Sequence, residues 1–305
     1  MKEKIIRLKN IIRGPICGAL TLGLIALNTL FWCSLLFFMA FLKFIIPQNS
    51  WRAFCSRILN GLAAGWVGVN NAIQNLTMNT RWVIHGMDSY NRGGWHLVIS
   101  NHQSWSDIFV LQRIFFRKIP FLKFFIKKEL IWFPIMGQAW WALDFPFMKR
   151  YSKALLEKKP HLKGKDIEIT LKACEKFKEI PVSIMNFVEG TRFTPQKRDA
   201  LQSPYINLLH PKAGGISYVL MAMGRQLDKI LDVSIIYPDG PASFWSFLCG
   251  KIKTVVVKIN AISVPEYLVG DYSQDEALRD KIQTWLNALW AEKDKILGAE
   301  KALTA

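Results

Sequence analysis

The stretch Leu97-Val-Ile-Ser-Asn101-His102-Gln-Ser-Trp-Ser-Asp107 joins an apolar, β-branched run to a polar turn and the start of a helical pattern. Similar apolar runs recur along the second part of the chain, with helical patterns between them. We expect strands at 81–85, 96–100, 182–188, 231–237 and 254–259, and helices at 103–116, 167–180, 212–224 and 274–297. Strands that alternate with helices are typical of a parallel sheet covered on both faces. Residues 81–305 are therefore predicted to form an α/β domain with a mixed, mainly parallel sheet flanked by helices.

Residues 1–80 have the composition of a membrane-associated segment. Twenty-nine residues without a charge lie between Arg13 and Lys43, and about 20 apolar residues suffice to cross the hydrocarbon layer as a helix. A second uncharged stretch, 58–80, carries three glycines near one helix face. That spacing favours close packing of two helices over a phosphate-binding loop. We predict an N-terminal, membrane-embedded helical hairpin over residues 1–80.

Basic residues flank the first apolar segment on both sides. Five of them precede it, which indicates a cytoplasmic N-terminus, while Lys43, Arg52 and Arg57 follow it without an acid. Flanks of the same sign do not distinguish a helix that crosses the membrane from a hairpin that dips into one leaflet. Both arrangements fit the sequence.

Composition and charge restrict the classes of function. The chain has 305 residues, of which 51% are hydrophobic and 13% aromatic, and this apolar content excludes a disordered protein. Forty Lys and Arg against 23 Asp and Glu give a net charge of +17, which indicates an anionic partner such as acidic phospholipid, a phosphorylated substrate or nucleic acid. No nucleic-acid-binding module is recognisable, so nucleic acid is disfavoured. Neither the five cysteines nor the five histidines show the spacing of a disulfide framework or a metal site.

His102 and Asp107 form the first candidate catalytic pair. In open α/β sheets, ligands bind beyond the carboxyl ends of the strands, and the strand 96–100 would deliver His102 to such a position. Asp107 would stand in the first turn of the next helix. A carboxylate bonded to one ring nitrogen raises the basicity of the other, so His102 is a candidate general base. Taken alone, this spacing also fits a structural histidine and a helix-start aspartate.

A second polar cluster, Glu189-Gly190-Thr191-Arg192, follows the apolar run 182–188. Gly190 permits close approach of the backbone, and Thr191 and Arg192 offer donors suited to a phosphate or a carboxylate. Alone, the cluster is an ordinary polar turn. If the two strands run parallel, however, both clusters face the same crevice, as a substrate site requires.

Four sequence blocks in a fixed order resemble a known family. They are Asn101-His102-x4-Asp107; Lys128-Glu-Leu-Ile-Trp-Phe-Pro-Ile-Met-Gly137 with Phe147-Met-Lys149-Arg150; Phe187-Val-Glu-Gly-Thr-Arg192; and Val233-Ser-Ile-Ile-Tyr-Pro238. Over roughly residues 81–260 the chain resembles the glycerolipid acyltransferases of the lysophosphatidic acid acyltransferase (PlsC-like) type. The segment 203–215 further resembles the bacterial YihG branch. The resemblance implies the glycerolipid acyltransferase fold, a place in the bacterial inner membrane and a catalytic domain that faces the cytoplasm.

The resemblance also implies a reaction. His102 would deprotonate the free hydroxyl, at sn-2, of lysophosphatidic acid, and Asp107 would orient the imidazole and stabilise its charge. The oxygen would attack an acyl thioester, acyl-CoA or acyl-acyl carrier protein, and give phosphatidic acid, as in a 1-acylglycerol-3-phosphate O-acyltransferase. Arg192 would bind the phosphate of the acceptor, in a turn shaped by Glu189. Further candidates for contacts with the substrate are Gly190, Thr191, Lys149, Arg150 and Lys212. No bound cofactor is expected.

Two departures from the family pattern bear on this reading. Val188 stands where the family usually has proline, a change that should leave the turn intact. The second block ends in Lys149-Arg150, where the family commonly has Asp-Arg. This second departure keeps open a remodelling acyltransferase for another lysophospholipid, such as lysophosphatidylglycerol. A catalytically silent membrane scaffold is disfavoured, because both polar clusters are complete.

The segment between Phe115 and Phe133 interleaves aromatic residues with Lys and Arg. Basic residues attract anionic head groups, and aromatic rings settle at the membrane interface. We therefore expect this segment to contact anionic membrane lipids. The alternative is an aromatic core with solvated lysines.

Overall fold

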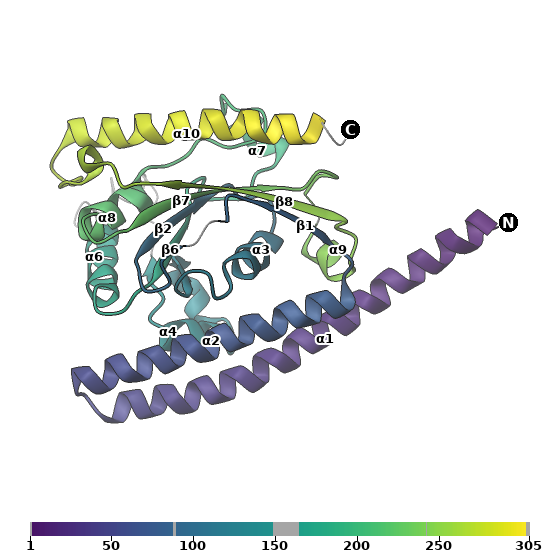
Figure 1. Cartoon of the computed structure of the whole chain (residues 1–305), viewed down its shortest axis with the longest axis horizontal. Coiled ribbons are helices and arrows are strands. Elements are labelled where there is room, and N and C mark those ends of the chain that lie inside the picture. The colour runs from purple at the N-terminus through teal and green to yellow at the C-terminus, as the bar shows by residue number, and fades with distance from the viewer. Residues whose placement is uncertain (1, 88–89, 149–164, 242, 303–305) are drawn as a thin grey trace.

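The computed structural model describes residues 2–87, 90–148, 165–241 and 243–302. A six-stranded sheet forms the centre of the domain, in the order β1-β8-β7-β2-β6-β3 (Figure 1). Its strands are β1 (Arg81–His85), β2 (His96–Ser100), β3 (Leu122–Phe124), β6 (Ser183–Phe187), β7 (Lys229–Ile236) and β8 (Thr254–Ile262). Every neighbouring pair is parallel except β7 with β8, which is antiparallel. The predicted mixed, mainly parallel sheet is confirmed.

Helices cover both faces of the sheet. One face carries α6 (Lys165–Phe177), α8 (Gly214–Met223) and α10 (Glu276–Ala302), and the other carries α3 (Ser106–Phe115) and α9 (Phe244–Leu248) (Figure 1). Side chains alternate between the faces of a strand, and β2 directs Leu97 and Ile99 into the first apolar cluster and Val98 into the second. The strands and helices expected from the sequence are all present, with ends shifted by a few residues.

Several short elements carry no clear sequence pattern. They are β3, the parallel pair β4 (Ile126–Lys127) and β5 (Phe147–Met148), the helices α4 (Met136–Ala142) and α7 (Pro195–Ala200), and the 3-10 turns η1 (Lys128–Trp132) and η3 (Glu266–Leu268). Most of them lie in or next to the aromatic and basic segment. Phe115 and Lys123 of that segment are buried, whereas Trp132 is 82% exposed. The first part of the segment is therefore core, and its contact with lipid stays a prediction for the exposed part around Trp132.

The helices α1 (Lys2–Ile45) and α2 (Asn49–Thr77) form a hairpin against the domain (Figure 1). Gly65 of α2 lies against Trp32 of α1, where an added Cβ atom would stand 2.3 Å from the indole ring. The close helix approach predicted from the glycines is thus confirmed at Gly65. Asn28 donates a hydrogen bond to Asn70 Oδ1 at 2.9 Å and links the two helices through a buried polar contact.

The helix α1 contacts the domain at Gly18 and again near its C-terminal end, at Lys43. By length and composition, its segment Gly14–Ile45 is long and apolar enough to cross a membrane. Gly18 lies against the side chain of Cys249, next to α9, and Lys43 forms an ion pair with Asp144 at 2.6 Å. These two contacts are separated by roughly 37 Å of helix. The outer face of α1 exposes a row of large apolar side chains, Leu20, Leu27, Phe31, Phe38 and Phe41.

Candidate active site

The turn between β2 and α3 brings His102 and Asp107 together, as the sequence predicts. Nδ1 of His102 lies 2.8 Å from Oδ2 of Asp107, and the carboxylate is fully buried. The backbone N–H groups of Gln103 and Ser104 donate to the same oxygen, at 2.6 and 2.9 Å. Because Asp107 occupies Nδ1, the other ring nitrogen, Nε2, is left to accept a proton. The pair therefore has the geometry of an oriented general base.

Two aromatic residues complete the surroundings of this pair, and sequence reasoning assigned a role to neither. The hydroxyl of Tyr237 donates to Oδ1 of Asp107 at 2.7 Å, and burial together with the Asp107 charge raises the pKa of Tyr237 well above its usual value. The ring of Phe187 stacks on the His102 imidazole, with centroids 3.9 Å apart. Both residues lie at the carboxyl ends of strands that neighbour β2. This position after an apolar run was the feature of the sequence that could have identified them as site residues.

Asn101 fixes the turn between β2 and α3 to the neighbouring strand β7. Its Nδ2 donates to the carbonyl oxygen of Ile235 at 2.9 Å, and its Oδ1 accepts from the Ile235 N–H at 2.8 Å. Gln103 adds a third bond, from Nε2 to the same carbonyl at 3.0 Å. Asn101 is fully buried, and buried polar groups of this kind are costly to leave without partners. The turn is consequently held in one conformation.

Glu189 joins the second polar cluster to the first. Its Oε1 accepts from the His102 N–H at 3.1 Å, and its Oε2 accepts from the Leu209 N–H at 2.8 Å. Burial raises the pKa of Glu189 to about 8, although these two N–H donors act against the shift. As the sequence predicts, the two clusters lie at the same edge of the sheet, because β2 and β6 are parallel neighbours.

The turn after Glu189 presents the remaining donors. Gly190 adopts a φ of 72°, in the left-handed region that favours glycine. Lys197, which sequence reasoning missed, donates to Thr191 Oγ1 at 2.8 Å and to the Arg192 carbonyl oxygen at 3.1 Å. Thr194 caps the helix α7 and accepts a hydrogen bond from the Lys197 N–H, which positions Lys197. The pair Thr194-Pro195 is typical of a helix start and could have identified this short helix from the sequence.

Arg192 lies beside the turn between β2 and α3. Its guanidinium stands 4.9 Å from the ring centroid of Trp105, the residue that precedes α3. Within the described part of the chain, Arg192 forms no ion pair with a carboxylate. A half-buried guanidinium without such a partner can bind a phosphate through several N–H donors.

The three other predicted cations have different positions. Lys149 and Arg150 lie outside the described residues. The side chain of Lys212 is exposed, and its backbone N–H donates to the Val188 carbonyl oxygen at 2.8 Å. The structure thus brings His102, Asp107 and the Glu189 cluster together, whereas Lys212 adjoins that cluster through its backbone and has an exposed side chain. Among the described residues, no group of three or more His, Cys, Asp or Glu could hold a metal ion.

The sequence matches the family described as Acyltransferase over residues 81–238, which is more than half of the chain. The chain belongs to the acyltransferase family. The fold of this acyltransferase is similar to the crystal structure of the 1-acyl-sn-glycerophosphate (LPA) acyltransferase, PlsC, from Thermotoga maritima. The TM-score is 0.54 and the sequence identity 17%, over 93% of this chain and 98% of that one. No curated protein matches the sequence. The family match includes both polar clusters and Tyr237 of the acyltransferase.

Proposed function

We propose that this acyltransferase moves a fatty acyl group from an acyl thioester to the free hydroxyl, at sn-2, of lysophosphatidic acid, and so forms phosphatidic acid. The observation that carries the proposal is the 2.8 Å contact between His102 and the buried Asp107, at the sheet edge that also carries Arg192. Membership of the acyltransferase family supports acyl transfer. The similarity of the fold to that of an LPA acyltransferase supports the choice of acceptor.

The proposed reaction is a direct transfer in a ternary complex. Nε2 of His102 takes the proton of the acceptor hydroxyl while the oxygen attacks the thioester carbonyl, and Asp107 stabilises the imidazolium. Collapse of the tetrahedral intermediate forms the ester and breaks the carbon–sulfur bond, and the leaving thiolate takes the proton from His102. General-base assistance of this kind contributes about a hundred- to ten-thousand-fold in rate. No Gly-x-Ser-x-Gly elbow stands in the sequence, so we propose no acyl-enzyme.

Binding of the substrates follows from the charges around the pair. Arg192 binds the phosphate of the acceptor, with Glu189, Gly190 and Thr191 shaping its turn. Lys149, Arg150 and Lys212 are further candidates for contacts with anionic groups. The acyl donor is acyl-CoA or acyl-acyl carrier protein, and the protein itself holds no cofactor in this scheme.

The hairpin lies in one leaflet of the bacterial inner membrane in our proposal, with the catalytic domain on the cytoplasmic side. Contacts of α1 with the domain near Gly18 and at Lys43 support a helix that lies along the domain rather than one that leaves it to cross a bilayer. The apolar outer face of α1 is then the part that enters the lipid. The likeness of the segment 203–215 to the YihG branch also stays a prediction.

The proposal is tested by comparing the wild type with His102→Ala. Detergent-solubilised protein receives labelled lysophosphatidic acid and oleoyl-CoA, and phosphatidic acid is measured. We expect product from the wild type and a loss of at least about a hundredfold in the variant, whereas His85→Ala, at the exposed end of β1, keeps its rate. Equal rates of product formation by the wild type and His102→Ala would overturn the mechanism, and absence of product from the wild type would revive the silent-scaffold alternative.

The acceptor is tested separately by competition. Lysophosphatidic acid and lysophosphatidylglycerol are offered together at equal concentration, with acyl-CoA or acyl-acyl carrier protein as donor. We expect phosphatidic acid as the main product. A preference for lysophosphatidylglycerol would support the remodelling alternative, which the Lys149-Arg150 pair suggests.

A further inference from the structure

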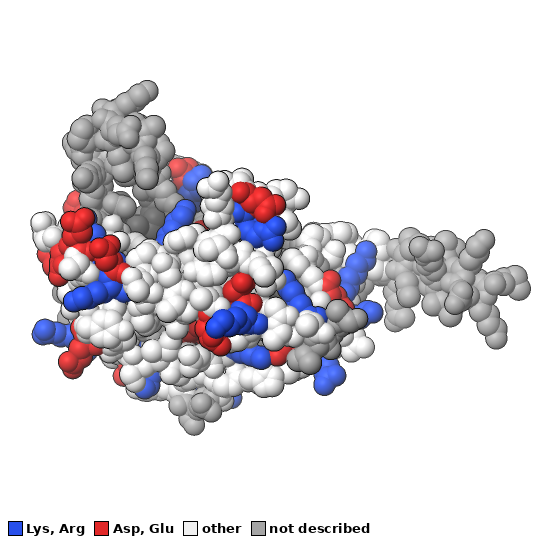
Figure 2. All heavy atoms as spheres, turned by 90° about the horizontal axis from the view of Figure 1, so that it is seen from above, with Lys and Arg blue, Asp and Glu red and all other residues white. Residues whose placement is uncertain are grey.

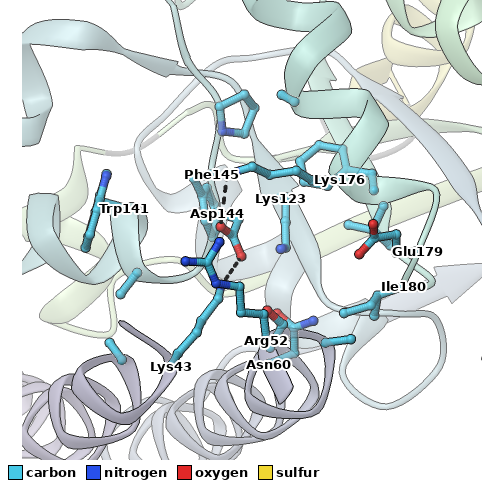
Figure 3. Close-up of a pocket in the computed structure, with 18 of the residues that line it drawn as sticks. Lys43, Arg52, Asn60, Lys123, Trp141, Asp144, Phe145, Lys176, Glu179 and Ile180 are labelled. Atoms are coloured by element: carbon cyan, nitrogen blue, oxygen red, sulfur yellow. Dashed lines mark hydrogen bonds and ion pairs between the residues drawn. The ribbon is translucent and has the colours of Figure 1, made fainter. Parts of the chain in front are cut away.

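A cavity of about 480 Å³ opens between the turn of the hairpin and the edge of the domain (Figure 3). Its walls come from the end of α1, the first half of α2, the residues around β3 and Asp144, and the end of α6. Pro181 and Val182, which line it, precede the amino end of β6, whereas His102 lies beyond the carboxyl end of the neighbouring strand β2. None of His102, Asp107 and Arg192 lines this cavity. The cavity is therefore separate from the catalytic pair.

Three lysines surround Asp144 in this cavity. Lys43 Nζ lies 2.6 Å from Asp144 Oδ2, and Lys176 Nζ lies 3.6 Å from Asp144 Oδ1 (Figure 3). Lys123 points into the same space and donates to the Leu143 carbonyl oxygen at 2.7 Å. One carboxylate cannot neutralise three ammonium groups, so the cavity keeps an excess of positive charge.

Arg52 adds a fourth cation to this group. Its side chain reaches from α2 towards Asp144 (Figure 3), and among the described residues it forms no ion pair. Glu179, on the opposite wall, also lacks an ion pair there and offsets one charge at most. By contrast, Lys and Arg are interspersed with Asp and Glu on the face that carries α10 (Figure 2).

Burial and the neighbouring cations both disfavour the charged form of Lys123. The residue is 5% exposed, and burial lowers its pKa to about 8; Asp144 opposes the shift, and the like charges of Lys43 and Lys176 add to it. An anion in the cavity would stabilise all of these cations at once. A phosphate suits the place, because several donors can reach its oxygens from different walls.

The rim of the cavity is apolar and faces outward. Phe44, at the end of α1, is 73% exposed, and Trp141, at the end of α4, is 58% exposed. Ile45 and Ile46 of the hairpin turn are exposed next to them. A basic pocket with an exposed apolar rim matches a ligand that has a charged head and hydrocarbon tails.

We propose that this cavity binds the phosphate of an anionic phospholipid head group, with the acyl chains lying against the apolar residues of the hairpin turn. This is a second lipid site, and it uses none of the residues that carry acyl transfer. The proposal rests on the interfacial position of the hairpin given above, but not on the reaction. A bound lipid there would join the hairpin to β3 and α6 of the domain.

The test compares lipid retention by the full-length protein in a neutral detergent. Dioleoyl phosphatidylglycerol or dioleoyl phosphatidylcholine is titrated in, and native mass spectrometry counts the lipids bound per chain. For the wild type we expect retention of phosphatidylglycerol but not of phosphatidylcholine, which carries no net charge. The double variant Arg52→Gln/Lys176→Gln is expected to bind phosphatidylglycerol about tenfold more weakly. The control Lys178→Gln/Arg225→Gln removes two exposed charges outside the cavity and keeps the wild-type affinity.

A second variant leaves every basic residue in place. Ser56 lines the cavity one helical turn after Arg52, so Ser56→Glu adds a competing carboxylate and is expected to weaken retention as well. Acyl transfer in neutral detergent stays within about twofold of the wild type for these variants, which shows that they fold. Unchanged retention in both cavity variants would overturn the proposal. Displacement of the lipid by millimolar inorganic phosphate would assign the site to free phosphate and would overturn the lipid assignment.

Discussion

The hydroxyl of Tyr237 donates a hydrogen bond to Oδ1 of Asp107 at 2.7 Å, while Oδ2 of the same carboxylate faces His102. Tyr237 follows β7, and Asp107 lies in the first turn of α3, which follows β2. The contact therefore links the carboxyl ends of the neighbouring strands β7 and β2 at the candidate active site. A fully buried carboxylate is costly unless donors surround it. Tyr237 supplies one such donor and holds the carboxylate plane in the orientation that His102 needs.

Replacement of Tyr237 by Phe removes this donor and keeps the ring. A hydrogen bond of about 1–1.5 kcal/mol corresponds to roughly tenfold in rate. We therefore expect Tyr237→Phe to lower kcat about tenfold, with the KM of both substrates unchanged, because Tyr237 is buried and contacts Asp107, the partner of the proposed base. Steady-state kinetics with lysophosphatidic acid and oleoyl-CoA measure both constants.

Two controls separate this effect from a general loss of stability. Tyr205→Phe also removes a hydrogen bond of a tyrosine hydroxyl, to the Asn287 carbonyl oxygen at 3.2 Å, and is expected to leave kcat unchanged. In a His102→Ala background, Tyr237→Phe is expected to have no further effect, because the two residues act through one base. Additive losses in the double variant would contradict the assigned role.

The sequence predicted the parts of the site that rest on strand order. An apolar run followed by His102 and Asp107, and a second run followed by Glu189, suffice to place both clusters at one edge if the strands are parallel. The structure confirms this, since β2 and β6 pair in parallel with Ser100 opposite Phe187. Hydrophobic pattern and turn chemistry thus carry most of the fold.

The parts that the sequence did not predict depend on contacts between distant residues. Tyr237 reaches Asp107 across 130 positions, and no local pattern encodes such a pairing. The strand β3 has only three residues and includes the buried Lys123. From the sequence, a charged residue at this position does not indicate a buried strand. The structure shows that its ammonium group is satisfied by a hydrogen bond to the Leu143 carbonyl oxygen. Short elements of this kind are set by tertiary contacts rather than by periodicity.

We expect substitution of Lys197, but not of Lys212, to weaken binding of the acceptor. Lys197 holds both Thr191 and the carbonyl of Arg192, whereas the Lys212 side chain is exposed. We expect Lys197→Met to raise the KM for lysophosphatidic acid about three- to tenfold with little change in kcat, since Arg192, the proposed phosphate ligand, loses a contact that holds its backbone. Lys212→Met serves as the matched control and is expected to change KM less than about twofold. A larger effect at Lys212 would restore it as a phosphate contact.

Lys293 links α10 to the sheet through a buried ion pair. Its Nζ lies 2.7 Å from Asp232 Oδ1 and donates to the Val233 carbonyl oxygen at 2.6 Å, and the residue is 1% exposed. Removal of one partner leaves a buried charge without compensation, so Lys293→Met is expected to lower the free energy of unfolding by about 3–5 kcal/mol. The matched control Lys295→Met, on the exposed face of the same helix, is expected to cost at most about 0.5 kcal/mol. Denaturant unfolding in detergent measures both, and equal losses would contradict the structural role of Lys293.

The raised pKa of Glu189 makes the free energy of unfolding depend on pH. Burial raises its pKa to about 8, against about 4.3 in an unfolded chain. Between these values the folded protein holds a proton that the unfolded chain has released, so the contribution of Glu189 to stability is full below about pH 4 and is lost as the pH rises towards 8. Lys123, whose pKa is lowered to about 8, acts only above that range and with the opposite sign, since its folded form has then already lost the proton that the unfolded chain still holds.

Removal of the titrating group should therefore flatten the pH dependence. We expect the midpoint of thermal unfolding of the wild type to fall more steeply between pH 5 and pH 7.5 than that of Glu189→Gln, because glutamine does not titrate. The variant starts from a lower midpoint at pH 5, since its amide cannot accept from both His102 and Leu209 and leaves one buried N–H unpaired, at a cost of about 1–3 kcal/mol. Glu266→Gln, on an exposed side chain, is the control and keeps the wild-type slope. Parallel curves for the wild type and Glu189→Gln would show that Glu189 is already ionised at pH 5, and that its two N–H donors outweigh burial.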